Sequence, residues 1–496
     1  MTPGSDPTVG AQLGLPKLLE PASGNQFRLL KQWINVCDSS HETCHRKDAR
    51  VPEMPTRLIE VGSSLKLVDS DEVDSSPYIA LSHCWGLLEE KERFCAFTHN
   101  IAQLKKSIDF ERLPLTFKDA VSVVRGLGFR YVWIDSLCII QDDDLDWETE
   151  AGKMEQVFSD AHFTIAASSA KLSNEGFLLP RKPRPCVQVS TQSTGQLYVC
   201  PNIDNFHKDV ELGELNRRGW VLQETVLSRR SIYFSSTQIY WECGVGVHYE
   251  TLARLSNSKA AFLGDANFPQ SALEYYRDGR QVLVQDLYER YSGLSFTKPS
   301  DRSVAILGLQ KRLERAFQTR AEFGLFSVYL ARGLLWERRD TKMKRITPRG
   351  RRVPSWSWFS KEGPIRYMNL QFEKIDWATK EFGNPFKRQT TTSFQESSTV
   401  RDDGDLVLPA HARKLHLDNL EKLVRINFDT GEEFSIENLR CVVIGRDKTD
   451  DSMDDPKQHV LVVHPLSTEK DVYERVGVAS LSLAHVGNER SRIAIC

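Results

Sequence analysis

The sequence predicts an α/β fold with a parallel sheet at its core, a helical extension and a small C-terminal all-β unit. Short apolar runs at residues 78–82, 131–134 and 162–166 alternate with two segments of helical periodicity. This strand, helix, strand, helix, strand order is typical of parallel strands joined by right-handed crossover helices. From about residue 385 onward, short alternating runs are separated by polar loops, which predicts the all-β unit.

Each of the three predicted core strands is a short apolar run. Tyr78–Ser82 leads directly into the sequence His83-Cys84-Trp85-Gly86, which indicates a buried strand followed by a turn. Tyr131–Ile134 ends at Asp135, and His162–Ala166 forms the third run. Parallel strands place their carboxyl ends at one edge of a sheet, where ligands bind in open α/β folds.

Two helices are expected between these strands, over residues 117–125 and 147–159. Thr116 should begin the first helix, with Asp119 three residues later completing a capping box, and Gly128 should follow its end. The apolar residues of each helix share one face. They are Phe117, Val121, Val124 and Leu127 in the first helix and Trp147, Ala151, Met154 and Phe158 in the second.

A third block predicts a short helix followed by two strands. The strands are Ser231–Phe234 and Ile239–Cys243, joined as a hairpin. Glu224 shares the helix with apolar neighbours, so it should be partly buried. A buried carboxylate needs a partner, and Arg218 is the nearest basic residue upstream. The pair is either structural or catalytic, and the sequence leaves both readings open.

These elements predict a candidate site. We expect Ser82, Cys84, Asp135 and Glu224 to converge on one concavity at the carboxyl ends of the strands, with Arg218 close to a carboxylate. The alternative is that Ser82 and Asp135 only cap the loops that follow their strands.

A second group of residues has the chemistry of a metal site. Cys37, His41 and Cys44 lie close together, and thiolate and imidazole are ligands that suit zinc. However, zinc-site cysteines usually come in two pairs, and no second pair follows at the expected spacing of ~12–20 residues. We therefore favour a plain helix end over a metal site, and we predict no metal.

Length and composition predict an ordinary soluble protein. The 496 residues suggest four segments: an N-terminal helical segment (1–50), an α/β domain (51–250), a helical extension (251–384) and a C-terminal β unit (385–496). Hydrophobic residues make up 40 % and the formal net charge is −2, which makes nucleic acid an unlikely partner. No apolar stretch is long enough to span a membrane and no signal peptide is recognised, so we expect a cytoplasmic location.

Three blocks of this sequence resemble the HET (heterokaryon incompatibility) domain of filamentous fungi. They are Tyr78–Gly86, Leu113–Ala120 with Tyr131–Gln141, and Arg218–Glu224 with Trp241–Cys243. Two positions depart from the family pattern: His83 stands where the family often has tyrosine, and Ile140 where it often has asparagine.

The resemblance implies a function in recognising non-self after fungal cells fuse and in triggering programmed cell death. It also implies a flavodoxin-like sheet, because HET domains have been compared with TIR domains, which assemble or cleave NAD. A protein partner, self-association or a small-molecule ligand would each fit the family. Some HET-like proteins lie beside biosynthetic genes, which leaves a role in secondary metabolism open.

Two classes of function therefore remain open: an effector that works by assembly, and an enzyme of unknown cofactor and substrate. One enzyme hypothesis is a TIR-like NAD glycohydrolase that uses a carboxylate. Its candidates are Glu148, Glu155 and Glu224. A less favoured hypothesis is a cysteine nucleophile, which needs a base within reach. Its candidates are Cys84 and Cys138, with His162 or His248 as the base. A third is a biosynthetic enzyme that binds a small metabolite.

Overall fold

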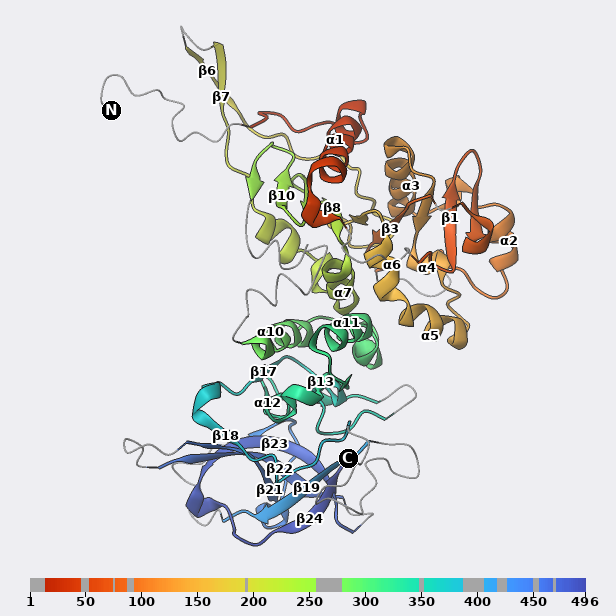
Figure 1. The fold of residues 1–496 in the computed structure, drawn as a ribbon. Coiled ribbons are helices and arrows are strands. Elements are labelled where there is room, and N and C mark those ends of the chain that lie inside the picture. Colours follow the sequence, from red (N-terminus) through yellow and green to blue (C-terminus); the bar gives the residue numbers. More distant parts are fainter. Residues whose placement is uncertain are drawn as a thin grey trace. The chain divides into compact units, whose positions relative to one another are not determined.

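The computed structural model describes residues 14–45, 53–74, 76–86, 93–191, 195–255, 279–347, 352–386, 406–416, 426–448, 455–466 and 470–496. The chain divides into two compact units, Met1–Tyr275 and Tyr276–Cys496 (Figure 1). Among these described residues, no helix is both long enough and apolar enough to cross a membrane.

The described residues of the first unit form a nine-stranded mixed sheet. Its four central strands are mutually parallel, and the strands on both sides of them are antiparallel. In spatial order the strands are β11 (Arg254–Leu255), β10 (Gly246–Tyr249), β9 (Ile239–Cys243), β8 (Arg230–Phe234), β5 (Thr164–Ala166), β3 (Tyr78–Ser82), β4 (Tyr131–Trp133), β1 (Arg57–Val61) and β2 (Leu65–Asp69). The predicted parallel core is confirmed, and it continues into the predicted β8–β9 hairpin.

The apolar runs that predicted these strands form the core of the sheet. Leu81, Ile134 and Ile165 are each at most 1 % exposed. All five residues of β3 are buried, so this strand is covered on both faces. A strand buried on both faces reads as a continuous apolar run, which is why the sequence pattern was informative here.

The described residues of the first unit contain seven α-helices. They are α1 (Gly24–Ser40), α2 (Ile101–Lys106), α3 (Leu115–Leu127), α4 (Asp135–Cys138), α5 (Asp144–Gly152), α6 (Met154–Asp160) and α7 (Gly219–Leu227), and a separate hairpin pairs β6 (Val187–Thr191) with β7 (Gly195–Val199). Gly128 follows α3 with φ +90° in the left-handed region, as its predicted role requires. The helix expected over residues 147–159 is two helices that meet at Lys153.

The capping box predicted at the start of α3 is wrong. The helix begins at Leu115, and the preceding Pro114 makes no side-chain cap. The Asp119 carboxylate instead accepts hydrogen bonds from the backbone N–H groups of Phe177 (2.6 Å) and Leu178 (2.9 Å). The Asp119 carboxylate, which the sequence pattern assigned to the start of α3, therefore binds the backbone of a loop almost 60 residues further along the chain.

The second unit begins with helices that are interleaved with short strands. The helices are α10 (Arg280–Ser292), α11 (Leu307–Phe317) and α12 (Leu330–Leu334), and the strands are β12 (Ala321–Glu322), β13 (Leu325–Phe326), β14 (Trp336–Arg338), β15 (Lys344–Arg345), β16 (Lys361–Glu362), β17 (Ile365–Tyr367) and β18 (Ile375–Trp377). Short antiparallel pairs join β12 to β13, β14 to β17 and β15 to β16. The region expected to be helical thus also contains strands.

The second unit ends in the predicted all-β structure. Its strands are β19 (Leu408–Lys414), β20 (Ile426–Phe428), β21 (Arg440–Asp447), β22 (Lys457–Pro465), β23 (Val472–Ser482) and β24 (Ser491–Ile495). The pairings β19–β21, β21–β22, β22–β23, β23–β24 and β24–β19 close a ring. Alternate residues of β21, such as Val442 and Val443, enter two different apolar clusters, and Leu330 of α12 belongs to the first. One of the alternating runs that predict this unit is residues 423–426, of which 423–425 lie outside the described residues.

Candidate functional site

The carboxyl ends of β3 and β4 bring the first predicted site residues together. Ser82 is the last residue of β3, and Asp135 begins α4, with Ile134 alone between it and the end of β4. The indole N–H of Trp85 donates a hydrogen bond to Asp135 Oδ2 (2.8 Å). Asp135 Oδ1 also accepts a hydrogen bond from the backbone N–H of Ser136 (2.6 Å). Asp135 therefore both orders its own loop and contacts the segment that follows the neighbouring strand.

Glu224 belongs to the same electrostatic group. It lies on α7, is 8 % exposed, and burial raises the pKa of its carboxyl to about 7. The negative charge of Asp135 adds to this rise, while the Ser82 hydroxyl and the positive charge of Arg218 oppose it. Because the Glu224 carboxyl responds to Ser82, Asp135 and Arg218, these three predicted residues lie close enough to Glu224 to act on its charge. Near neutral pH, this carboxyl exists in both protonation states.

Arg218 acts on the Glu224 carboxyl through its positive charge, and its side chain also contacts the turn after β3. Its Nη1 donates a hydrogen bond to the main-chain carbonyl oxygen of His83 (2.6 Å). Within the described part of the chain, no ion pair joins Arg218 directly to Glu224. The guanidinium thus ties the start of α7 to the turn after β3, and it acts on Glu224 through its charge.

His83 is a site residue that sequence reasoning treated only as a departure from a family pattern. Its Nδ1 lies 3.7 Å from Asp135 Oδ1, and its ring packs edge-on against Phe117. Burial lowers the His83 pKa to about 4, so the imidazole is neutral at neutral pH. Among the residues that the structure describes, neither ring nitrogen has a hydrogen-bond partner. His83 could have been identified from the sequence, because it is a polar residue that directly follows a buried parallel strand.

The two cysteine candidates are poor nucleophiles in this structure. Burial raises the pKa of the Cys84 thiol, and it raises the pKa of Cys138 to about 12. Reactive cysteines instead have lowered pKa values in partly exposed, electropositive surroundings. Of the two proposed bases, His162 Nε2 lies 3.4 Å from Asp38 Oδ2, and His248 stacks on His41. Both histidines are thus engaged with residues of the N-terminal segment, which weighs against a cysteine nucleophile.

The other two acidic candidates are in different surroundings from Glu224. Glu148 is exposed on α5, and Glu155 is buried within α6. Glu224 is the candidate whose carboxyl responds to Asp135 and Arg218.

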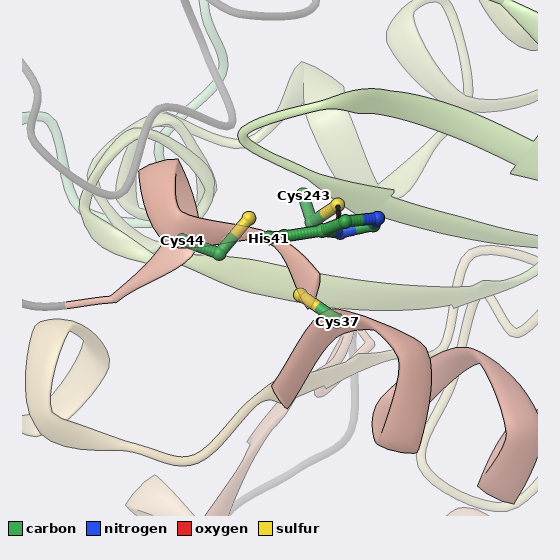
Figure 2. Close-up of side chains that lie close together, drawn as sticks. All are labelled: Cys37, His41, Cys44 and Cys243. Atoms are coloured by element: carbon green, nitrogen blue, oxygen red, sulfur yellow. Dashed lines mark hydrogen bonds between the residues drawn. The ribbon is translucent and has the colours of Figure 1, made fainter. Parts of the chain in front are cut away.

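A separate cluster has the composition of a metal centre. Figure 2 shows Cys37, His41, Cys44 and Cys243 with their side chains gathered in one place. One potential ligand atom from each residue lies within 4.8 Å of the others. Sequence reasoning found the first three residues but not Cys243, which is 202 residues from His41 along the chain.

Comparison with known proteins identifies one part of the chain. Residues 78–224 match the family model described as heterokaryon incompatibility protein (HET). No curated protein and no solved structure was found to match the chain. The matched segment contains all five predicted site residues and ends at Glu224, whereas the four residues of the cysteine–histidine cluster lie outside it.

Proposed function

We propose, because residues 78–224 match the HET family model, that the protein is a heterokaryon-incompatibility effector that triggers cell death after contact with non-self. The observation that carries this proposal is the family match itself. The polar group around Asp135 and Glu224 lies entirely within the matched residues, which makes it the candidate for the activity.

The topology of the sheet supports this choice of site. Numbered along the chain, the four parallel strands β3, β4, β5 and β8 have the spatial order 2-1-3-4. Flavodoxin-like sheets share this order, and their ligands bind beyond the strand ends where the order reverses, beside the first strand. Here that strand is β3, which ends at Ser82. A TIR-like arrangement is therefore part of the proposal.

Regulated expression in a filamentous fungus tests the proposed function. Expression of the wild-type protein should kill the cells. Asp135→Asn and Glu224→Gln should abolish killing while leaving the melting temperature nearly unchanged at about pH 5, where the Glu224 carboxyl is protonated. Glu148→Gln is the matched control, because this exposed carboxylate lies on α5 and should be dispensable. Survival of cells with a high level of folded wild-type protein would refute the effector function.

A second candidate function is an enzyme that cleaves NAD, and the protonation of Glu224 favours it. Two neighbouring carboxyl groups in different environments are the usual arrangement for acid–base or nucleophilic chemistry. In NAD hydrolysis, the bond between ribose and nicotinamide breaks, and a carboxylate stabilises the oxocarbenium-like centre. Water then adds to the ribose carbon and releases a proton, which gives ADP-ribose and free nicotinamide.

Mass spectrometry of NAD incubated with the purified full chain tests this second function. Turnover by the wild type and its loss in Glu224→Gln would support it. Intact NAD at high protein concentration, both for the dilute protein and for assembled protein, would exclude it. The same measurement on small molecules that co-purify with the protein would reveal a metabolite ligand.

A further inference from the structure

We propose that Cys37, His41, Cys44 and Cys243 bind one zinc ion as a structural centre. This site is separate from the proposed function, because all four residues lie outside the HET segment.

The distances within the cluster fit a single tetrahedral ion. Zinc binds sulfur at ~2.3 Å and nitrogen at ~2.0–2.1 Å, so a tetrahedral ion separates a sulfur and a nitrogen ligand by roughly 3.6 Å. Cys243 Sγ lies 3.5 Å from His41 Nδ1. All four ligand atoms lie within 4.8 Å of one another, which leaves room for one ion at their centre.

Local structure explains how three of the ligands come together. Cys37 lies in the last turn of α1, and the backbone N–H of His41 bonds to its carbonyl oxygen (3.3 Å) where the helix ends. A short 3₁₀ turn, Glu42–Cys44, then folds back, and the backbone N–H of Cys44 bonds to the His41 carbonyl oxygen (2.9 Å). Cys243 arrives from the end of β9 (Figure 2).

Burial indicates a structural and not a catalytic metal. The three cysteines are 0 % exposed, and His41 is half-buried. Four protein ligands complete the tetrahedral coordination of zinc and leave no open position for substrate or water. Three thiolates and one imidazole are soft and borderline ligands, which disfavours magnesium, calcium and manganese.

Buried cysteines are also common as ordinary core residues, so the alternative is simple packing. The cluster differs from simple packing because a polar imidazole nitrogen points at one of the three sulfur atoms. A hydrogen bond between thiol and imidazole would account for this one pair, whereas a single metal ion accounts for the convergence of all four ligand atoms.

The position of the cluster indicates what the zinc would stabilise. Cys243 pairs with Arg230, the first residue of β8, so the cluster lies at the amino-terminal edge of the parallel strands. The candidate site lies at the opposite, carboxyl-terminal edge. Arg230 forms an ion pair with Asp38, next to Cys37. The positive charge of Arg230 would offset part of the net negative charge of a zinc ion with three thiolates. The ion would stabilise the packing of the end of α1 against β9.

Metal analysis of the purified full chain tests the proposal. Protein prepared without chelators should contain about one zinc ion per chain. Cys243→Ser should lose at least tenfold in zinc content. Cys186→Ser is the matched control, because this cysteine lies in the same unit but outside the cluster, and it should retain the metal.

Cobalt substitution covers the case in which Cys243→Ser fails to fold. The wild-type protein loaded with cobalt should show the intense visible bands of tetrahedral thiolate coordination. In Cys44→His these bands should weaken and shift, because one sulfur ligand is exchanged for nitrogen. Removal of zinc from the wild type should lower the melting temperature, and added zinc should restore it. Metal-free wild-type protein that neither binds cobalt nor is stabilised by zinc would overturn the proposal, as would equal zinc content in Cys243→Ser and Cys186→Ser.

Discussion

Replacement of Glu224 by glutamine should change how the stability of the protein depends on pH. Burial raises the pKa of this carboxyl from 4.5 to about 7. Between these values the folded protein holds a proton that the unfolded chain releases, so the stabilisation is complete below pH 4.5 and is lost as pH rises through about 7. The displacement of the pKa corresponds to about 3 kcal/mol.

Urea unfolding at about pH 5 and about pH 8 measures this contribution. The amide of Glu224→Gln has the shape of the protonated carboxyl and cannot ionise. The free energy of unfolding of the variant relative to the wild type should therefore increase by up to about 3 kcal/mol between the two pH values. Because the variant is compared with the wild type at each pH, contributions from other groups that titrate equally in both proteins cancel.

The exposed Glu148 provides the control. The pH dependence of Glu148→Gln should follow that of the wild type. If the difference between wild type and Glu224→Gln stays constant from about pH 5 to about pH 8, the Glu224 carboxyl is not buried as described, and the reasoning about its two protonation states fails.

Three further predictions concern stability. Burial lowers the His83 pKa from 6.5 to about 4, so the contribution of the neutral imidazole to folding stability is present above pH 6.5 and is lost as pH falls toward 4. In urea unfolding, His83→Phe should therefore lose less stability than the wild type as the pH is lowered. An equal loss of stability in both proteins at low pH would contradict this prediction. Ile165→Ala should lower the free energy of unfolding by about 2–5 kcal/mol, since the side chain is fully buried, and a loss below about 1 kcal/mol would mean that the site is loosely packed. Gly128→Ala should lower the free energy of unfolding by about 1–2 kcal/mol, because a residue with a Cβ is strained at φ +90°. The added Cβ meets no atom within 4 Å, so backbone strain is the whole cost. An unchanged melting temperature in thermal unfolding would show that α3 does not end in this conformation.

The parallel core could be predicted from sequence because its strands are buried on both faces. Strands β1 and β2 were not predicted, since Arg57 begins β1 and the polar residues Glu60 and Lys66 interrupt the two short apolar runs. Arg57 is nevertheless buried, because its Nη2 donates a hydrogen bond to Asp146 Oδ1 (2.6 Å). A charge neutralised by a residue far along the chain cannot be recognised from local periodicity.

The candidate site and the metal cluster could likewise be predicted only in part. The proximity of Ser82 and Asp135 follows from the parallel order of neighbouring strands, and Glu224 reaches them from a predicted helix. The catalytic or binding roles of these residues stay predictions. Cys243 could not be assigned to the metal cluster, because at the end of an apolar strand it reads as an ordinary core cysteine. Only the pairing of β9 with β8 carries it to the end of α1.

The central place of β3 in the sheet has a consequence for the newly made chain. Tyr78 of β3 pairs with Tyr131 of β4, and Ala80 pairs with Thr164 of β5. During synthesis from the amino terminus, β3 therefore has no parallel neighbour until β4 has emerged, and its second edge stays open until β5 follows. An apolar strand with open edges is prone to pair with other chains. The meander of β8, β9 and β10 needs only local pairing, so chaperone dependence and degradation should concentrate on nascent chains that end before β5.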